Sequence, residues 1–124
     1  MKLKSLILVA LAGTLAPIEA QIVINEIHSD PEADLTGDEN GDGTRESCDD
    51  EFIELVNSGR AAVDLAGWTF ADEASVRHTF PAGTILEPNQ AVVVFGGGDP
   101  ANFLNFGSVL VQAASGGQLL LNNT

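Results

Sequence analysis

The sequence predicts one domain with an all-β fold, and three observations support this prediction. Short runs rich in Val, Ile, Leu and Phe are separated by Gly, Pro, Asn or Asp, as in strands joined by turns. After the first 20 residues, no window repeats its apolar residues with the 3.6-residue period of a helix. The length of 124 residues suits one domain. Because short strands bury their apolar faces only when two layers stack, we expect a β-sandwich.

Six runs have the composition of strands, and turn residues separate them. A further extended piece, 84–86, lies between a Pro-Ala-Gly turn and a Glu-Pro-Asn turn. The glycines at 96–98 are expected to end a strand, because neither a helix nor a Lys follows to make a phosphate-binding loop. The six predicted strands are Ile22–Ile27, Phe52–Asn57, Gly67–Phe70, Ala91–Phe95, Ser108–Gln112 and Gln118–Leu121.

The N-terminus has the features of a secretory signal peptide. Lys2 and Lys4 precede an apolar run from Leu6 to Leu15, and Ala16 or Ala20 offers a small residue for cleavage, of which we prefer Ala20. This run is shorter than the roughly 20 apolar residues that a membrane span needs. We therefore expect a signal peptide at 1–20, a single mature domain at 21–124, and a location that is extracellular, at the cell surface or in the periplasm.

The charge of the mature chain limits its partners. After residue 20 the chain has 3 basic and 17 acidic residues, which gives a net charge of −14. Nucleic acids and anionic membranes are bound through Lys and Arg, so we expect neither nucleic-acid binding nor membrane insertion. The expected partners are cations, cationic surfaces, or an unidentified protein or glycan ligand.

An acidic loop at 30–51 contains the spacing of a calcium-binding loop. Oxygen-bearing side chains stand at positions one, three, five, nine and twelve, with Gly43 at position six. The residue at position seven would contribute its backbone carbonyl. The alternative interpretation is a solvated acidic loop in which Gly and Asp only make turns. The calcium hypothesis predicts a structural Ca²⁺ with these ligands: Asp38, Asn40, Asp42, Thr44, Glu46 and Asp49.

Four other kinds of residue could carry chemistry. Glu26 and Glu54 lie in strands and could form a catalytic pair, but we favour hydrogen bonds to the backbone, Arg77 or His78. His28 and His78 lack nucleophile or zinc partners in sequence, so both are expected to be structural. Trp68 is expected to pack in the core. Cys48 is the only Cys, which leaves intermolecular pairing or a free thiol open.

Five motifs in order resemble the lamin tail domain family. They are Asn25-Glu26-Ile27, residues 50–57, the segment Val63-Asp64-Leu65-x-Gly67-Trp68-x-Phe70-x-Asp72, the segment His78-Thr79-Phe80-Pro81-x-Gly83-x-x-Leu86-x-Pro88, and residues 91–95. Leu119-x-Leu121-x-Asn123 resembles a late strand of the family. The resemblance implies an immunoglobulin-like β-sandwich that serves as a non-catalytic accessory module of secreted proteins.

The chain departs from the family pattern at two places. The acidic insertion occurs in only some relatives, and the sequence stops at Thr124, where relatives continue with further strands. The resemblance therefore implies a sandwich that lacks its last strands, or takes them from another chain, and that has an open sheet edge available for intermolecular contact.

Two functions follow from these observations. The preferred one is a secreted, non-catalytic module for adhesion or tethering, with a calcium-stabilised acidic loop. The alternative is a fragment or accessory domain of a secreted metal-dependent hydrolase, a phosphoesterase, nuclease or glycosidase. No catalytic constellation in the sequence supports the alternative, so we expect the chain not to be an enzyme.

Overall fold

The computed structural model describes residues 21–100 and 109–121, and its regular elements are strands apart from one short 3₁₀ turn. This confirms the all-β prediction. The predicted signal peptide at 1–20 lies outside the described residues.

One layer is a sheet of four strands in the order β1-β2-β7-β8. These strands are β1 (Ile22–His28), β2 (Phe52–Asn57), β7 (Ala91–Phe95) and β8 (Val109–Ala113). β8 runs parallel to β7, and the other neighbours are antiparallel. The predicted bounds of β2 and β7 are confirmed, and β1 extends one residue further than predicted. For β8, Ser108 lies outside the described residues, and the strand continues to Ala113.

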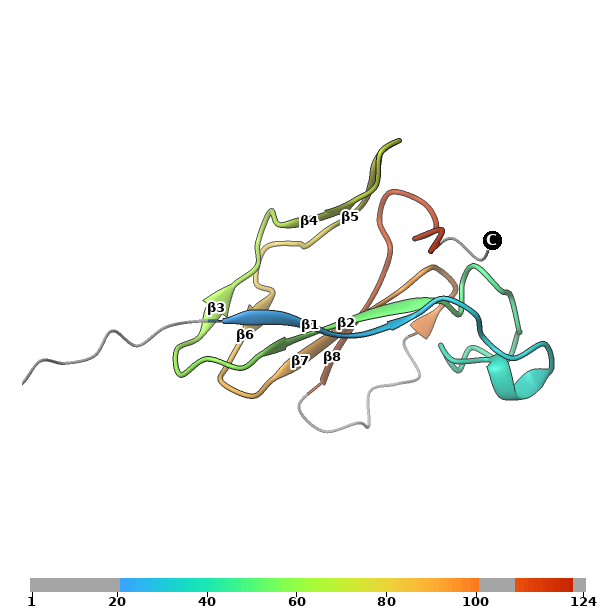
Figure 1. Cartoon of the computed structure of the whole chain (residues 1–124), viewed down its shortest axis with the longest axis horizontal. Coiled ribbons are helices and arrows are strands. Elements are labelled where there is room, and N and C mark those ends of the chain that lie inside the picture. Colours follow the sequence, from blue (N-terminus) through green and yellow to red (C-terminus); the bar gives the residue numbers. More distant parts are fainter. Residues whose placement is uncertain (1–20, 101–108, 122–124) are drawn as a thin grey trace, which may run out of the picture.

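The second layer consists of two small two-stranded sheets (Figure 1). One pairs β3 (Val63–Asp64) with β6 (Ile85–Leu86), and the other pairs β4 (Thr69–Ala71) with β5 (Val76–Thr79). The sequence predicted β6 as an extended piece and β4 with a start two residues too early. It did not predict β3 or β5.

The predicted strand Gln118–Leu121 is wrong. This segment is irregular, and Leu120 has a positive φ of 53°, which a strand does not allow. Leu119 is nevertheless buried in the core, and the backbone N–H of Leu121 donates to the side chain of Glu51 (2.9 Å). Residues 118–121 therefore have the apolar composition of a strand because they anchor a loop to the core.

The core lies between the two layers. In β2, Ile53 and Leu55 point inward while Phe52 and Glu54 point to the outer face, as the alternation predicts. Inward-facing Val92 and Val94 continue this surface across β7. The second layer covers it with buried side chains, among them Leu65, Phe80 and Leu86.

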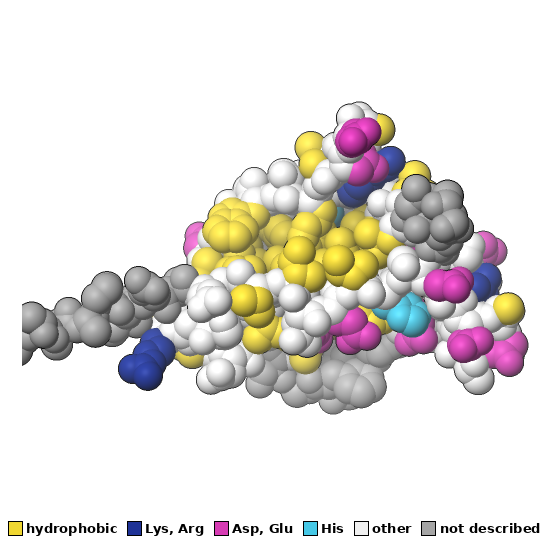
Figure 2. All heavy atoms as spheres, viewed as in Figure 1, with side chains coloured by type: hydrophobic (Ala, Val, Ile, Leu, Met, Phe, Trp, Pro, Cys, Tyr) yellow, Lys and Arg dark blue, Asp and Glu magenta, His cyan; other side chains and the backbone are white. Residues whose placement is uncertain are grey.

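The prediction that Trp68 packs in the core is wrong, because 49% of this residue is exposed. Gly67 has a positive φ of 81°, and the N–H of Trp68 donates to the carbonyl of Leu65, so the indole belongs to a turn that precedes β4. In the view of Figure 2, a hydrophobic area lies between the β4–β5 hairpin and β1.

Candidate calcium-binding loop

The acidic loop connects β1 to β2 and projects from one end of the sandwich (Figure 1). Its first half contains the 3₁₀ turn η1 (Leu35–Gly37). Asp34 caps this turn, because its Oδ1 accepts hydrogen bonds from the backbone N–H and the hydroxyl of Thr36. These bonds hold the pKa of Asp34 below its usual value.

The first three predicted ligands each close a turn of the loop backbone. Asp38 Oδ2 accepts from the N–H of Gly43 (2.9 Å), and Asn40 Oδ1 accepts from the N–H of Asp42 (2.9 Å). Asp42 Oδ1 accepts from the N–H of Thr44 (2.8 Å). Positive φ angles at the two glycines in this stretch permit such tight winding. Positions one to seven of the predicted site therefore form one compact segment.

One oxygen of this compact segment has no hydrogen-bond partner. Asp38 Oδ1 is buried, and no described residue donates a hydrogen bond to it. A buried carboxylate oxygen without a partner is costly, by about 1–3 kcal/mol or more for a charged group. This oxygen stands at position one of the loop, where the calcium hypothesis places a ligand.

The only basic residue of the loop leaves the carboxylates uncompensated. Arg45 donates from Nε to the carbonyl of Glu32 (2.6 Å) and from a terminal nitrogen to the carbonyl of Pro31 (2.7 Å). Both acceptors are backbone carbonyls. The guanidinium therefore fastens the loop to its own first residues rather than pairing with an acidic side chain.

The last two predicted ligands are not gathered with the first three. The side chain of Glu46 is exposed, and Asp49 Oδ1 accepts from Gln118 Nε2 (2.8 Å). Across residues 21–100 and 109–121, no three His, Cys, Asp or Glu side chains come together as they do around a metal ion. A cation held by all six predicted ligands would therefore require Glu46 and Asp49 to turn toward Asp38.

Asp50 organises the loop, a role that the sequence did not reveal. It is fully buried, and its carboxylate accepts from the N–H of Asn40 (3.2 Å) and from the N–H of Glu46 (2.7 Å). One side chain thus joins the two halves of the loop. It is the second of three consecutive acidic residues, and the sequence pattern does not show that Asp50 and Glu51 are buried while Asp49 is not.

The loop docks on the turn that follows β7. Asn40 Nδ2 donates to the carbonyl of Gly97 (3.3 Å), and the N–H of Asp99 donates to Asp42 Oδ2 (3.1 Å). A Cβ at Gly96 would stand 1.8 Å from the carbonyl oxygen of Cys48, so this approach requires glycine. The triple-glycine segment ends β7, as predicted, and also receives the acidic loop.

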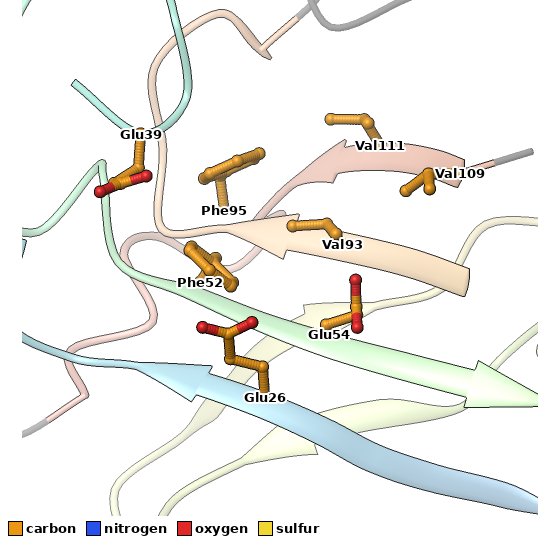
Figure 3. Close-up of a pocket in the computed structure, with 8 residues that line it drawn as sticks. All are labelled: Glu26, Glu39, Phe52, Glu54, Val93, Phe95, Val109 and Val111. Atoms are coloured by element: carbon orange, nitrogen blue, oxygen red, sulfur yellow. The ribbon is translucent and has the colours of Figure 1, made fainter. Parts of the chain in front are cut away.

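A pocket of about 240 Å³ lies on the outer face of the four-stranded sheet. Glu26 and Glu54 are a cross-strand pair on β1 and β2, and both point into this pocket together with Glu39 from the loop (Figure 3). Its remaining described walls are apolar: Phe52, Val93, Phe95, Val109 and Val111.

The expectation that Arg77 or His78 bonds to these glutamates is wrong. Glu54 accepts from Asn25 Nδ2, whereas Arg77 pairs with Asp72 (2.7 Å) and His78 bonds to Gln112. The sequence could not assign these partners, because they depend on how a β-bulge in β1 and the two layers are placed.

His28 ends β1 close to this pocket. Its ring stacks on Phe52 with centroids 5.1 Å apart, and its Nε2 lies 3.7 Å from Glu39. Cys48 is a free, partly buried thiol within the described residues, where its sulfur lies 3.9 Å from the hydroxyl of Ser47.

His78 belongs to a buried chain of hydrogen bonds. The Thr84 hydroxyl donates to the carbonyl of Pro81 (2.9 Å), so it accepts from Gln112 Nε2 (3.0 Å). Gln112 Oε1 then accepts from His78 Nε2 (2.8 Å), which fixes the neutral Nε2–H tautomer. Nδ1 is buried and has no partner among the described residues. Burial lowers the pKa of His78, and the bond to Gln112 opposes this shift only in part.

The sequence profile of the Lamin Tail Domain family matches residues 16–123. Because the match covers most of the chain, the chain belongs to this family, and its fold is the immunoglobulin-like β-sandwich that the strand pattern and the resemblance predicted. No curated protein matches the chain. None of the helices in the described part of the chain has the length and apolar character needed to cross a membrane.

Proposed function

We propose that this lamin tail domain is a non-catalytic binding or tethering module that acts outside the cytoplasm, with an acidic loop that Ca²⁺ stabilises. The N-terminal sequence supports export, and the family supports a binding role. The ligand class is a protein or glycan of neutral or positive charge, because the chain carries a net charge of −13.

The observation that carries the calcium part of the proposal is the conformation of residues 38–44. Its turns are closed by the side chains at positions one, three and five, and Asp38 Oδ1 is left buried without a hydrogen-bond donor. Ca²⁺ binds carboxylate, amide and carbonyl oxygens, and it tolerates irregular geometry. A cation at Asp38 Oδ1 would supply the missing partner, and rotation of Glu46 and Asp49 would complete the shell.

Calorimetric titration of the full chain with CaCl₂ tests this proposal. The variant D38N/D42N keeps an acceptor oxygen for each turn but removes two charges, whereas the control E73Q/E87Q removes two exposed charges from other loops. We expect a single calcium site with a Kd of about 10⁻⁴–10⁻³ M that is lost in D38N/D42N and kept in the control. Equal weakening by both double changes would show that calcium only screens the overall negative charge.

The alternative, a fragment or accessory domain of a secreted metal-dependent hydrolase, would use the three glutamates that line the outer pocket, although these are not gathered as metal ligands among the described residues. The described walls beside them are apolar and contribute neither a nucleophile nor a cationic group. A panel of chromogenic esters, phosphodiesters and glycosides with Ca²⁺, Mg²⁺ or Mn²⁺ distinguishes the two functions. Metal-dependent turnover that disappears in E26Q/E54Q would favour the hydrolase.

A further inference from the structure

The inner face of β1 is exposed where the neighbouring strands are covered. Ile24 pairs with Leu55 and Ile27 pairs with Ile53, so all four side chains point to the same face of the sheet. The two residues of β2 are 4% and 8% exposed, whereas Ile24 and Ile27 are 60% and 56% exposed. The β-bulge at Asn25 keeps both isoleucines on this inner face.

The second layer stops before it reaches β1. His78 on β5 bonds to Gln112 on β8, so β5 lies over that end of the sheet. Phe70 on β4 lines a pocket with Ile53, so β4 lies over β2. Among the described strands, none pairs with the other edge of β4, and the high exposure of Ile24 and Ile27 shows that this part of β1 is left uncovered.

The edge of β4 on the β1 side can pair with another strand. The carbonyl of Trp68 accepts from the N–H of Phe80 on the β5 side, so the backbone N–H and carbonyl of Thr69 point to the opposite side. The outer edge of β5 is already used, because the N–H of Thr79 donates to Ser115 Oγ. Among described strands, β5 is the only neighbour of β4.

The space beside this edge is apolar. A pocket of about 270 Å³ is lined by Ile53, Phe70 and the segment Leu119–Leu121, with Asp72 and Arg77 at its polar end. Figure 2 shows a hydrophobic area between the β4–β5 hairpin and β1. A contiguous apolar area of this kind on a soluble domain indicates an interaction site.

We propose that this gap, the β1–β4 groove, receives one extended segment of a partner polypeptide, which adds to the free edge of β4 as a third strand. Alternate apolar side chains of the segment would cover Ile24 and Ile27, and its other face would carry neutral or basic residues. Charge favours this partner over a second copy, because two copies with a net charge of −13 each repel one another. The inference rests on the proposed binding role and is independent of the calcium loop.

A labelled peptide of about ten residues that alternates Val with Thr and Lys is a suitable probe for strand addition. Fluorescence anisotropy with the full chain would measure its binding. The variant I24D/I27D places charges in the groove, and L35D makes the same change at a residue that is 74% exposed in the acidic loop. Two further peptides carry N-methyl groups on the odd or on the even backbone amides.

We expect I24D/I27D to weaken binding by about tenfold or more and L35D to leave it unchanged. Only one of the two methylated peptides should lose affinity, because a strand offers alternate N–H groups to each neighbour. This comparison uses the unmodified protein, so it does not depend on the folding of a variant.

Equal binding of both methylated peptides, or unchanged binding to I24D/I27D, would overturn strand addition. Dimerisation of the chain that I24D/I27D abolishes, without peptide binding, would show that a second copy is the occupant. Either failure leaves the calcium titration of the acidic loop unaffected.

Discussion

At the scale of single residues, the buried side chain of His78 makes the stability of the protein depend on pH. His78 donates through Nε2 to Gln112, and its buried Nδ1 has no partner among the described residues. Protonation would place a donor and a charge on Nδ1 in an apolar environment between Phe70 and Phe80. The neutral ring is therefore favoured in the folded state.

The lowered pKa of His78 predicts a pH dependence of stability. A group whose folded-state pKa is depressed contributes its full stability above its unfolded pKa, near 6.5, and loses it as the pH falls toward the folded-state value. We expect the free energy of unfolding in urea to fall between pH 7.5 and pH 5, and to fall less in H78Q. His28 is present in both the unmodified protein and H78Q, so its contribution to the pH dependence is the same in both. Parallel pH profiles would contradict this account.

Gly96 and Gly97 allow a test of how closely the acidic loop packs. A Cβ at Gly96 would meet the backbone carbonyl of Cys48, whereas a Cβ at Gly97 would meet the movable carboxylate of Asp49 at 2.3 Å. We expect G96A to lower the free energy of unfolding by about 1–3 kcal/mol or more, and G97A to lower it by less. Equal effects in urea unfolding would show that the loop does not dock as described.

At the scale of elements, the acidic loop depends on Asp50. Its carboxylate accepts two backbone N–H groups from opposite halves of the loop, so D50A leaves both donors without this partner. We expect a loss of about 1–3 kcal/mol in urea unfolding and weaker calcium binding, because the loop is no longer held together. The matched change D30A, at an exposed position of the same loop, should shift stability by less than about 0.5 kcal/mol. Similar losses in both variants would argue against this role.

Strands were predictable from sequence where they are long enough to show their own pattern. β2 and β7 have five or six residues of clear apolar character, and their predicted bounds are confirmed. β3 has only two residues and forms because β6 supplies its hydrogen bonds. The residue pattern of such a short segment does not show which other strand it pairs with. Leu119 gave a strand signal because it is buried, although the backbone at Leu120 turns away from an extended conformation.

The site was predictable only in part, for a related reason. The six calcium ligands stay a prediction. The turns of residues 38–44 agree with the alternative expectation that Asp and Gly make turns there, and they are local, since each bond spans two to five residues. The burial of Asp50 and the docking of the loop on Gly97 depend on contacts between distant segments. The exposure of Trp68 likewise follows from its place in the turn after Gly67, which the apolar pattern of the sequence did not reveal.

At the scale of the whole molecule, a small acidic sandwich leaves Ile24 and Ile27 of β1 exposed and has a strongly charged loop. The 17 acidic residues after residue 20 far outnumber the 3 basic residues, so the excess negative charges repel one another, and Arg45 does not neutralise the loop carboxylates. Strand addition would cover the groove, and a cation would neutralise the loop. These two effects act at different places and can be measured separately.

Thermal unfolding of the full chain, followed by circular dichroism, tests the central claim most directly. Samples would contain about 10 mM Ca²⁺, the same concentration of Mg²⁺, or chelator. With a Kd of about 10⁻⁴–10⁻³ M, calcium should add about 1.4–2.7 kcal/mol, which raises Tm by roughly 5 °C or more. We predict this rise with Ca²⁺ beyond any rise with Mg²⁺. Equal Tm values in all three conditions, in a protein that unfolds cooperatively, would contradict the claim and leave residues 38–49 as a solvated acidic loop.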